Sequence, residues 1–193
     1  MKTNLVLFGK PGAGKGTQAA FLKDTYALKH ISTGDVFRHH ISQNTSLGQL
    51  AKSYMDQGDL VPDTVTIKML EEAVIQSPDA AGFIFDGFPR TTAQAAALDI
   101  FLSTKGMAIS ATIALEADED VLTARLLERG KESGRPDDQD ESKIRNRFQE
   151  YNVKTAPLEA YYSSQNKFFA IDGIGAISEI TMRIAAVIDQ LGK

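Results

Sequence analysis

The sequence contains no cysteine, and this absence excludes disulfides, thiolate metal sites and a cysteine nucleophile. It also has no uninterrupted apolar run of about 18 residues, the length that a membrane-spanning helix requires. The apolar run nearest the start, residues 5–8, is too short for the core of a signal peptide. We therefore expect a soluble protein of the cytoplasm that has no membrane partner.

Basic charge is not in excess either. Lysine and arginine number 21 against 25 aspartate and glutamate residues, so the formal net charge is -4, which argues against a dedicated nucleic-acid-binding protein. The composition, 42% hydrophobic and 24% charged, is that of an ordinary globular protein. At 193 residues the chain is expected to form a single domain, 1–193, with small inserted lobes, and nothing in it indicates more than a monomer.

Short apolar segments alternate with longer segments of helical periodicity, which predicts an α/β fold with a parallel sheet between helices. Strands are expected at residues 4–8, 29–32, 82–86, 108–115 and 168–171. Helices are expected at 15–26, 34–43, 47–56, 63–75, 92–105, 118–128, 138–150, 157–164 and 178–191.

Two regions interrupt this alternation. Three helical patterns lie between the second and third strands, more than one crossover needs, so residues 32–61 are expected to form an inserted lobe. Residues 129–138 are rich in glycine and charge and contain no residue of the kind that forms a core. We expect this second region to be an exposed, mobile loop.

A glycine-rich segment, residues 9–17, follows the first predicted strand and precedes the first predicted helix. Its small residues let backbone N–H groups converge on phosphate oxygens, and Lys15 adds a mobile positive charge. A turn with no ligand is the alternative, but the position between a strand and a helix favours a phosphate-binding loop. Gly16 separates Lys15 from Thr17, whereas the strict motif has Ser or Thr directly after the lysine to hold Mg²⁺, so direct coordination by Thr17 is not predicted.

Asp86, Thr33 and Gln94 each have both a functional and a structural interpretation. Asp86 ends a predicted strand and is placed to hold Mg²⁺ beside the phosphate loop, or only to cap a turn; Arg90, close behind it, can bind a phosphate through two hydrogen bonds. Thr33 precedes a predicted helix and is equally interpreted as its cap or as a ligand. Thr91 and Gln94 have the spacing of a capping box, so Gln94 is either a cap or a ligand.

The segment Gly-x-Pro-Gly-x-Gly-Lys-Gly-Thr-Gln, ending at Gln18, resembles the nucleoside monophosphate kinases, and the adenylate kinases most closely. Asp-Gly-Phe-Pro-Arg, residues 86–90, is similar to the segment with which that family binds the acceptor nucleotide. The resemblance covers residues 4–191. It implies a three-layer P-loop fold with a five-stranded parallel sheet, a nucleoside-monophosphate-binding lobe at 32–61 and a short lid at 129–138.

The resemblance also implies an activity and the residues for it. The reaction is the reversible, Mg²⁺-dependent transfer of a phosphoryl group from ATP to AMP, giving two ADP, in adenine nucleotide homeostasis. Catalysis is assigned to Lys15, Arg90, Arg129, Arg135 and Arg147. ATP is assigned to Gly12, Ala13, Gly14, Lys15, Gly16, Thr17, Arg125, Arg129 and Gly175. AMP is assigned to Thr33, Arg38, Gly58, Asp59, Leu60, Val61, Gly87, Phe88, Pro89, Arg90, Gln94, Arg135 and Arg147, and Mg²⁺, through water, to Asp86.

The lid region leaves alternatives open. One extra residue between Asp138 and Arg147 makes Arg145 a competitor for the role of Arg147. Asp137 and Asp138 resemble the acids at the hinge of the family's lid, although Asp138 could equally cap the next helix. The lid is short and contains neither cysteine nor histidine, so no zinc site is expected. The histidines at 30, 39 and 40 form no metal-binding spacing, and His39 and His40 are expected at the surface.

Two other functions predict motifs that differ from those of this sequence. The related uridylate and cytidylate kinases commonly have asparagine after Phe-Pro-Arg, where this chain has Thr91, which favours AMP as the acceptor. A GTP-dependent switch protein predicts the guanine-binding motif Asn-Lys-x-Asp, which the sequence lacks.

Overall fold

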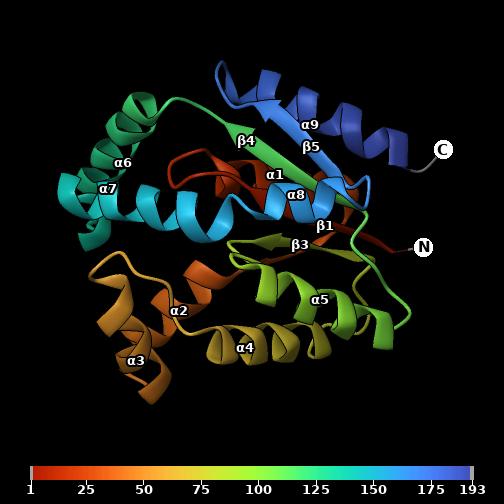
Figure 1. Cartoon of the computed structure of the whole chain (residues 1–193), viewed down its shortest axis with the longest axis horizontal. Helices are drawn as coiled ribbons and strands as arrows, with labels where there is room; N and C mark the ends of the chain where they lie inside the picture. The colour runs from red at the N-terminus through yellow and green to blue at the C-terminus, as the bar shows by residue number, and fades with distance from the viewer. Residues whose placement is uncertain (1, 192–193) are drawn as a thin grey trace.

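A five-stranded parallel sheet forms the centre of the computed structural model, which describes residues 2–191 (Figure 1). Its strands are β1 (Thr3–Phe8), β2 (Lys29–Ser32), β3 (Gly82–Asp86), β4 (Ala111–Glu116) and β5 (Phe168–Asp172), in the spatial order β2-β3-β1-β4-β5. Strand β1 pairs with β3 on one side and with β4 on the other. Every residue of β3 is buried, as expected for an apolar strand covered on both faces. The predicted fold class is confirmed.

Helices cover both faces of the sheet and make it the middle of three layers (Figure 1). On one face, Leu5 and Leu7 of β1 join an apolar cluster with residues of α1 (Lys15–Tyr26), α6 (Glu119–Ser133), α7 (Glu141–Glu150) and α9 (Ile177–Leu191). On the other face, Val6 and Phe8 join residues of α4 (Asp63–Ile75), α5 (Thr92–Thr104) and α8 (Leu158–Ser163). The alternation along β1 follows from the two-residue period of a strand.

The segment between β2 and β3 has a small core of its own. Helices α2 (Thr33–Ser42) and α3 (Ser46–Met55) lie beyond the end of the sheet (Figure 1), and their buried residues Phe37 and Ala51 pack with Val61 and Met69. The two helices approach closely at Gly48, where a Cβ atom would lie 2.1 Å from the carbonyl oxygen of His40. Only glycine allows this contact.

The region 129–138 differs from its prediction. Helix α6 continues past residue 128 to Ser133 and ends where Gly134 adopts a left-handed conformation, with φ 66. Gly130 does not break the helix, because it packs against the backbone of Asp138, whose oxygen would lie 2.7 Å from a Cβ there. Pro136–Asp138 forms a short 3₁₀ turn, and Asp138 is 0% exposed. The prediction of a loop throughout this region is therefore wrong, and Gly130 and Asp138 are buried, whereas most residues between them are exposed as predicted.

Two other boundaries differ from their predictions by more than one residue. Strand β4 begins at Ala111, not at residue 108, because the side chain of Asn4 donates to the carbonyl oxygen of Ala108 (2.8 Å) and takes the place of a regular ladder bond. Helix α7 begins at Glu141, capped by Asp140. The turn after it, Tyr151–Thr155, is π-helical and leads toward α8, so that both helices lie along one line in Figure 1. No helix between residues 2 and 191 has the length and apolar character to cross a membrane.

Candidate active site

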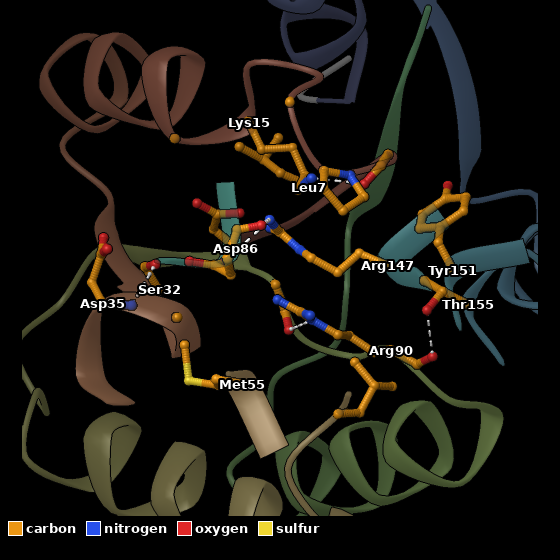
Figure 2. Close-up of a pocket in the computed structure, with 18 of the residues that line it drawn as sticks. Leu7, Lys15, Ser32, Asp35, Met55, Asp86, Arg90, Arg147, Tyr151 and Thr155 are labelled. Carbon is orange, nitrogen blue, oxygen red and sulfur yellow. Dashed lines mark hydrogen bonds and ion pairs between the residues drawn. The ribbon is translucent and has the colours of Figure 1, made fainter. Parts of the chain in front are cut away.

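A cavity of about 440 Å³ opens where the strands end at their carboxyl side, the usual ligand position in a parallel sheet. The following predicted residues line it: Gly12, Gly14, Lys15, Gly16, Thr17, Arg38, Gly58, Asp59, Leu60, Asp86, Gly87, Pro89, Arg90, Arg129, Arg135 and Arg147. They come from separate stretches of the chain, between residue 12 and residue 147. Figure 2 shows Lys15, Asp86, Arg90 and Arg147 pointing into one space.

The phosphate loop is built from backbone. Gly12 and Gly14 have φ values of 84 and 94, which favour glycine. The Lys15 ammonium donates to the carbonyl oxygens of Gly9 (2.7 Å) and Lys10 (3.0 Å), which fold the side chain back over the loop. Within the described residues, no side chain caps the start of α1, so its first N–H groups remain available for an anion.

Lys15 is held in a strongly cationic environment. Burial lowers the pKa of Lys15 from 10.5 to about 8, the charge of Asp86 opposes this shift, and the nearby arginines add to it. Burial also lowers the pKa of Arg90 to about 10, with Arg147 as the next cause. A cluster of buried cations in a protein of net charge -4 needs an anion to offset its mutual repulsion.

Asp86 lies at the centre of this group. It ends β3, is 9% exposed, and its Oδ2 lies 3.4 Å from Nε2 of His30. His30 also lines the cavity. A Cβ at Gly16 would lie 3.6 Å from the same Oδ2, which places the carboxylate directly beside the phosphate loop.

Gly87 brings Thr33 and Arg90 together. Its carbonyl oxygen accepts hydrogen bonds from the Thr33 hydroxyl (2.9 Å) and the Arg90 Nε (2.8 Å). The cap of α2 is instead Ser32, whose hydroxyl accepts from the N–H of Asp35 (3.3 Å). The interpretation of Thr33 as a helix cap is therefore wrong, and its side chain faces the site.

Two arginines of the lid region share one buried acid. Asp138 accepts from Arg129 Nε (2.7 Å) and Nη2 (3.0 Å) and from Arg147 Nη1 (2.7 Å). Burial by itself would raise the pKa of Asp138, but the hydrogen bonds and charges of the two arginines bring it below 3.8. Asp138 is thus occupied by arginines, and its interpretation as a helix cap is wrong because Asp140 has that role.

The structure separates the two candidates on α7. Arg147 lines the cavity, whereas Arg145 has a side chain that is 72% exposed and pairs with Glu141 (2.5 Å) on the surface. Only Arg147 is near the phosphate loop, so it is the better candidate for the lid-helix role.

Asp35 connects the two inserted regions. Its Oδ1 accepts from Arg38 (2.5 Å), and Arg135 Nη2 lies 3.8 Å from the same oxygen. Burial favours a higher pKa for Asp35, but the hydrogen bond and charge of Arg38 hold it below 3.8. Residues 32–61 and 129–138 therefore meet through one carboxylate at the mouth of the cavity.

A second, smaller cavity of about 50 Å³ adjoins the first and is lined by Thr33, Phe37, Val61, Thr66 and Gln94, among others. Gln94 is 1% exposed. Its backbone N–H donates to Thr91 Oγ1 (3.1 Å), as a capping box predicts. Its side chain departs from that pattern, because Oε1 accepts from the N–H of Arg90 (2.7 Å) and Nε2 donates to Asp63 (2.7 Å).

Four predicted residues lie outside both cavities. Ala13 and Phe88 are buried in the two main apolar clusters. Arg125 donates to the carbonyl oxygen of Gly173 (3.3 Å), and Gly175, with φ 120, follows in the same loop. Arg125, on α6, therefore lies beside the loop that contains Gly173 and Gly175.

Sequence reasoning missed several residues that line the main cavity. Tyr151 and Thr155 come from the π-helical turn, and the Thr155 hydroxyl donates to the carbonyl oxygen of Arg90 (2.9 Å), as Figure 2 shows. No local pattern marks these residues, although a π-helical turn inside a helix is frequently a functional feature. Asp63, which lines neither cavity but accepts from Gln94 Nε2, was also missed, because an acid in the first turn of a helix has an ordinary structural explanation.

The site combines a phosphate loop after the first strand of a parallel sheet with an acid at the end of the neighbouring strand, and arginines face both. This combination defines a P-loop phosphotransferase of the nucleoside monophosphate kinase class. Comparison with known proteins agrees. The family model described as adenylate kinase matches residues 7–167. The adenylate kinase of Flavobacterium psychrophilum is 65% identical over 188 residues, which are 97% of this chain and 99% of the relative.

Two further adenylate kinases extend the range of similarity. That of Flavobacterium johnsoniae is 63% identical and that of Bacteroides fragilis 45% identical, each over 97% of this chain and 99% of the relative. The chain belongs to the adenylate kinase family, and its activity is phosphoryl transfer between adenine nucleotides. The predicted family and activity are confirmed, and the comparisons favour them over the two alternatives.

Proposed function

We propose that this site transfers the γ-phosphoryl group of Mg·ATP to AMP, giving two ADP, and that it also catalyses the reverse reaction. The observation that carries the proposal is the convergence of Lys15, Arg90 and Arg147, from three distant parts of the chain, on one cavity beside Asp86. Phosphoryl transfer needs little covalent chemistry from the protein, so cations that position two nucleotides in line and neutralise the moving group are sufficient.

The donor triphosphate is assigned to the phosphate loop. The uncapped N–H groups of α1 and the Lys15 ammonium would bind its phosphates, together with Gly12 to Thr17 and Arg129. Arg125 and the loop at Gly175 would lie beside its base, which their mutual proximity supports.

The acceptor is assigned to the other side of the cavity. Arg38, Arg90 and Arg135 would bind its phosphate, since a guanidinium can hold two phosphate oxygens at once. The smaller cavity would take its base, between Thr33, residues 58–61 and Gln94.

Magnesium enters as part of the substrate Mg·ATP. This ion keeps several waters and is commonly bound by one or two carboxylates together with substrate phosphates. Asp86, largely buried and beside the phosphate loop, fits this requirement. Within residues 2–191 there is no group of three or more His, Asp or Glu that could hold a metal. We therefore expect a zinc-selective chelator to leave activity unchanged once Mg²⁺ is restored; activity recovered only by zinc would contradict this.

Residues 32–61 and 129–138 are proposed to be the acceptor lobe and the lid. The contacts of Arg38 and Arg135 with Asp35 support this division, as does the amide of Asn146 on α7, which donates to the carbonyl oxygen of Gln57 (2.9 Å). We further propose that the protein acts as a monomer in the cytoplasm. Light scattering on the purified chain tests the first point, and a stable dimer would contradict it.

A coupled assay for ADP tests the proposed function. The purified protein is given Mg·ATP with AMP, UMP, CMP or no acceptor. We expect rapid ADP formation with AMP and much slower formation with the pyrimidine nucleotides. Without an acceptor we expect almost none, because water is then the remaining nucleophile and a site built for transfer must exclude it from ATP. Equal rates with UMP, or a rate independent of acceptor, would contradict the proposal.

A further inference from the structure

Gln94 has a side-chain amide whose orientation is fixed from both ends. Its Oε1 accepts from the backbone N–H of Arg90 (2.7 Å), and its Nε2 donates to Asp63 Oδ1 (2.7 Å). If the amide rotated by half a turn, its NH₂ group would face the Arg90 N–H and its oxygen would face the Asp63 carboxylate. Two favourable hydrogen bonds would become two repulsive contacts in a buried site. The amide therefore has one allowed orientation.

Asp63 is itself held in place. Its second oxygen, Oδ2, accepts from the hydroxyl of Thr91 (2.8 Å), the same hydroxyl that caps α5. Asp63 begins α4, so one carboxylate joins the start of that helix to the start of α5. It is absent from the residues that line either cavity, whereas Gln94 lines the smaller one. Its direct hydrogen bond to Gln94 is therefore the shortest route by which Asp63 can affect a nucleotide.

The locked amide has one acceptor position and one donor position left. An amide oxygen can accept two hydrogen bonds and an NH₂ group can donate two, and the protein uses one of each. The remaining pair matches adenine, which offers an amino donor beside a ring-nitrogen acceptor. A purine with an oxygen in place of the 6-amino group offers an acceptor there and would meet the amide oxygen instead.

We propose that Asp63 is a positioning residue that makes the acceptor site select 6-amino over 6-oxo purine monophosphates, by fixing the orientation of Gln94. The inference rests on the proposed function, in which the base of the acceptor lies against Gln94. Sites built to hydrogen-bond one pattern reject the other strongly, because a mismatch leaves buried polar groups unpaired. The selection would be lost in part without Asp63, since the N–H of Arg90 still opposes rotation.

The test compares AMP with IMP as acceptors, because these two nucleotides differ only at the edge that the amide would contact. For the native protein and each variant, kcat and KM are measured for both acceptors. Asp63→Ala should raise KM for AMP, lower KM for IMP and reduce the AMP/IMP ratio of kcat/KM about tenfold, a change equivalent to roughly 1.4 kcal/mol. Asp63→Ser, a substitution suited to a helix start, is too short to reach Gln94 and should do the same if the alanine variant folds poorly.

Two controls separate positioning from structure. Asp63→Asn keeps a carbonyl oxygen that can accept from Gln94 Nε2, so its AMP/IMP ratio should stay within about threefold of the native ratio. Thr45→Ala removes the hydroxyl that accepts from the N–H of Gly48 at the start of α3, and should lower the melting temperature without changing the ratio.

The outcomes distinguish this inference from the proposed function. Gln94→Ala should lower the AMP/IMP ratio at least as far as Asp63→Ala; if it leaves the ratio unchanged, the base contact in the proposed function is wrong. If Gln94→Ala changes the ratio but Asp63→Ala and Asp63→Ser weaken AMP and IMP equally, Asp63 has only a structural role and the inference is overturned. Equal loss of the ratio in Asp63→Asn and Asp63→Ala would also overturn it, since charge alone would then be responsible.

Discussion

The phosphate loop and the lid region bring cations to the same cavity by different means. Lys15 is held by two backbone carbonyl oxygens within its own loop, whereas Arg129 and Arg147 are held by the carboxylate of Asp138, nine residues from each of them. A site made from the backbone of one short segment leaves a readable motif in the sequence. A site made from side chains on separate elements depends on how those elements pack, and such packing leaves little local trace.

The largest expected effect is at Lys15. Lys15→Met removes the positive side chain that folds back over the phosphate loop, so we expect turnover to fall at least about a hundredfold with no loss of melting temperature. The matched control is Lys23→Met at the exposed end of the same helix, which should keep near-native turnover. Near-native activity of Lys15→Met would remove this residue from the mechanism.

The next effect tests the lid side of the comparison. Asp138→Asn leaves Arg129 and Arg147 facing one neutral amide, so we expect a loss of roughly 2 kcal/mol of stability, discounted because Arg129 is partly exposed. Turnover should also fall, since Arg129 loses its carboxylate partner and Arg147 keeps only its contacts with Asp137 (3.1 Å). Denaturant unfolding and the ADP assay measure the two effects.

Glu141→Gln serves as the control for Asp138→Asn, because it breaks the exposed pair with Arg145 and should cost no more than about 0.5 kcal/mol. Equal losses in the two variants would mean that the buried acid has no special role. In the native protein the depressed pKa of Asp138 means that its stabilising contribution persists above pH 4 and disappears only as the pH falls through that lowered pKa.

These cases show how far the sequence alone leads. All five strands and the phosphate loop were predicted from local patterns, because apolar runs, glycines and their order along the chain are local properties. The continuation of α6 was not, because Gly130 is tolerated only through its contact with Asp138. The contacts of Asp63 were missed for the same reason, since they join the starts of two helices that are about 30 residues apart in the chain.

A smaller, pH-dependent effect follows from the environment of Lys15. Because the pKa of Lys15 is about 8, kcat/KM for ATP should fall as pH rises through that value, by up to about tenfold per pH unit. Stability should change in the opposite direction. Below pH 8 the buried charge of Lys15 lowers the free energy of unfolding. As the pH rises from about 8 toward 10.5, the folded protein loses this proton while the unfolded chain still binds it, so the free energy of unfolding rises. Lys15→Met should lack both trends; if it shows the same pH profiles as the native protein, another group is responsible.

Amide hydrogen exchange tests most directly whether the two kinds of cation close on one polyphosphate. It is measured on the free protein, with AMP, and with a bisubstrate mimic in which five phosphates join two adenosines. We expect AMP to protect mainly residues 32–61, where Arg38 would meet its phosphate, because the lid arginines gain little from AMP alone. The mimic should protect residues 129–138 as well, above all those after α6 ends at Ser133. Unchanged exchange at residues 129–138 with the mimic would contradict the assignment of this region as a lid.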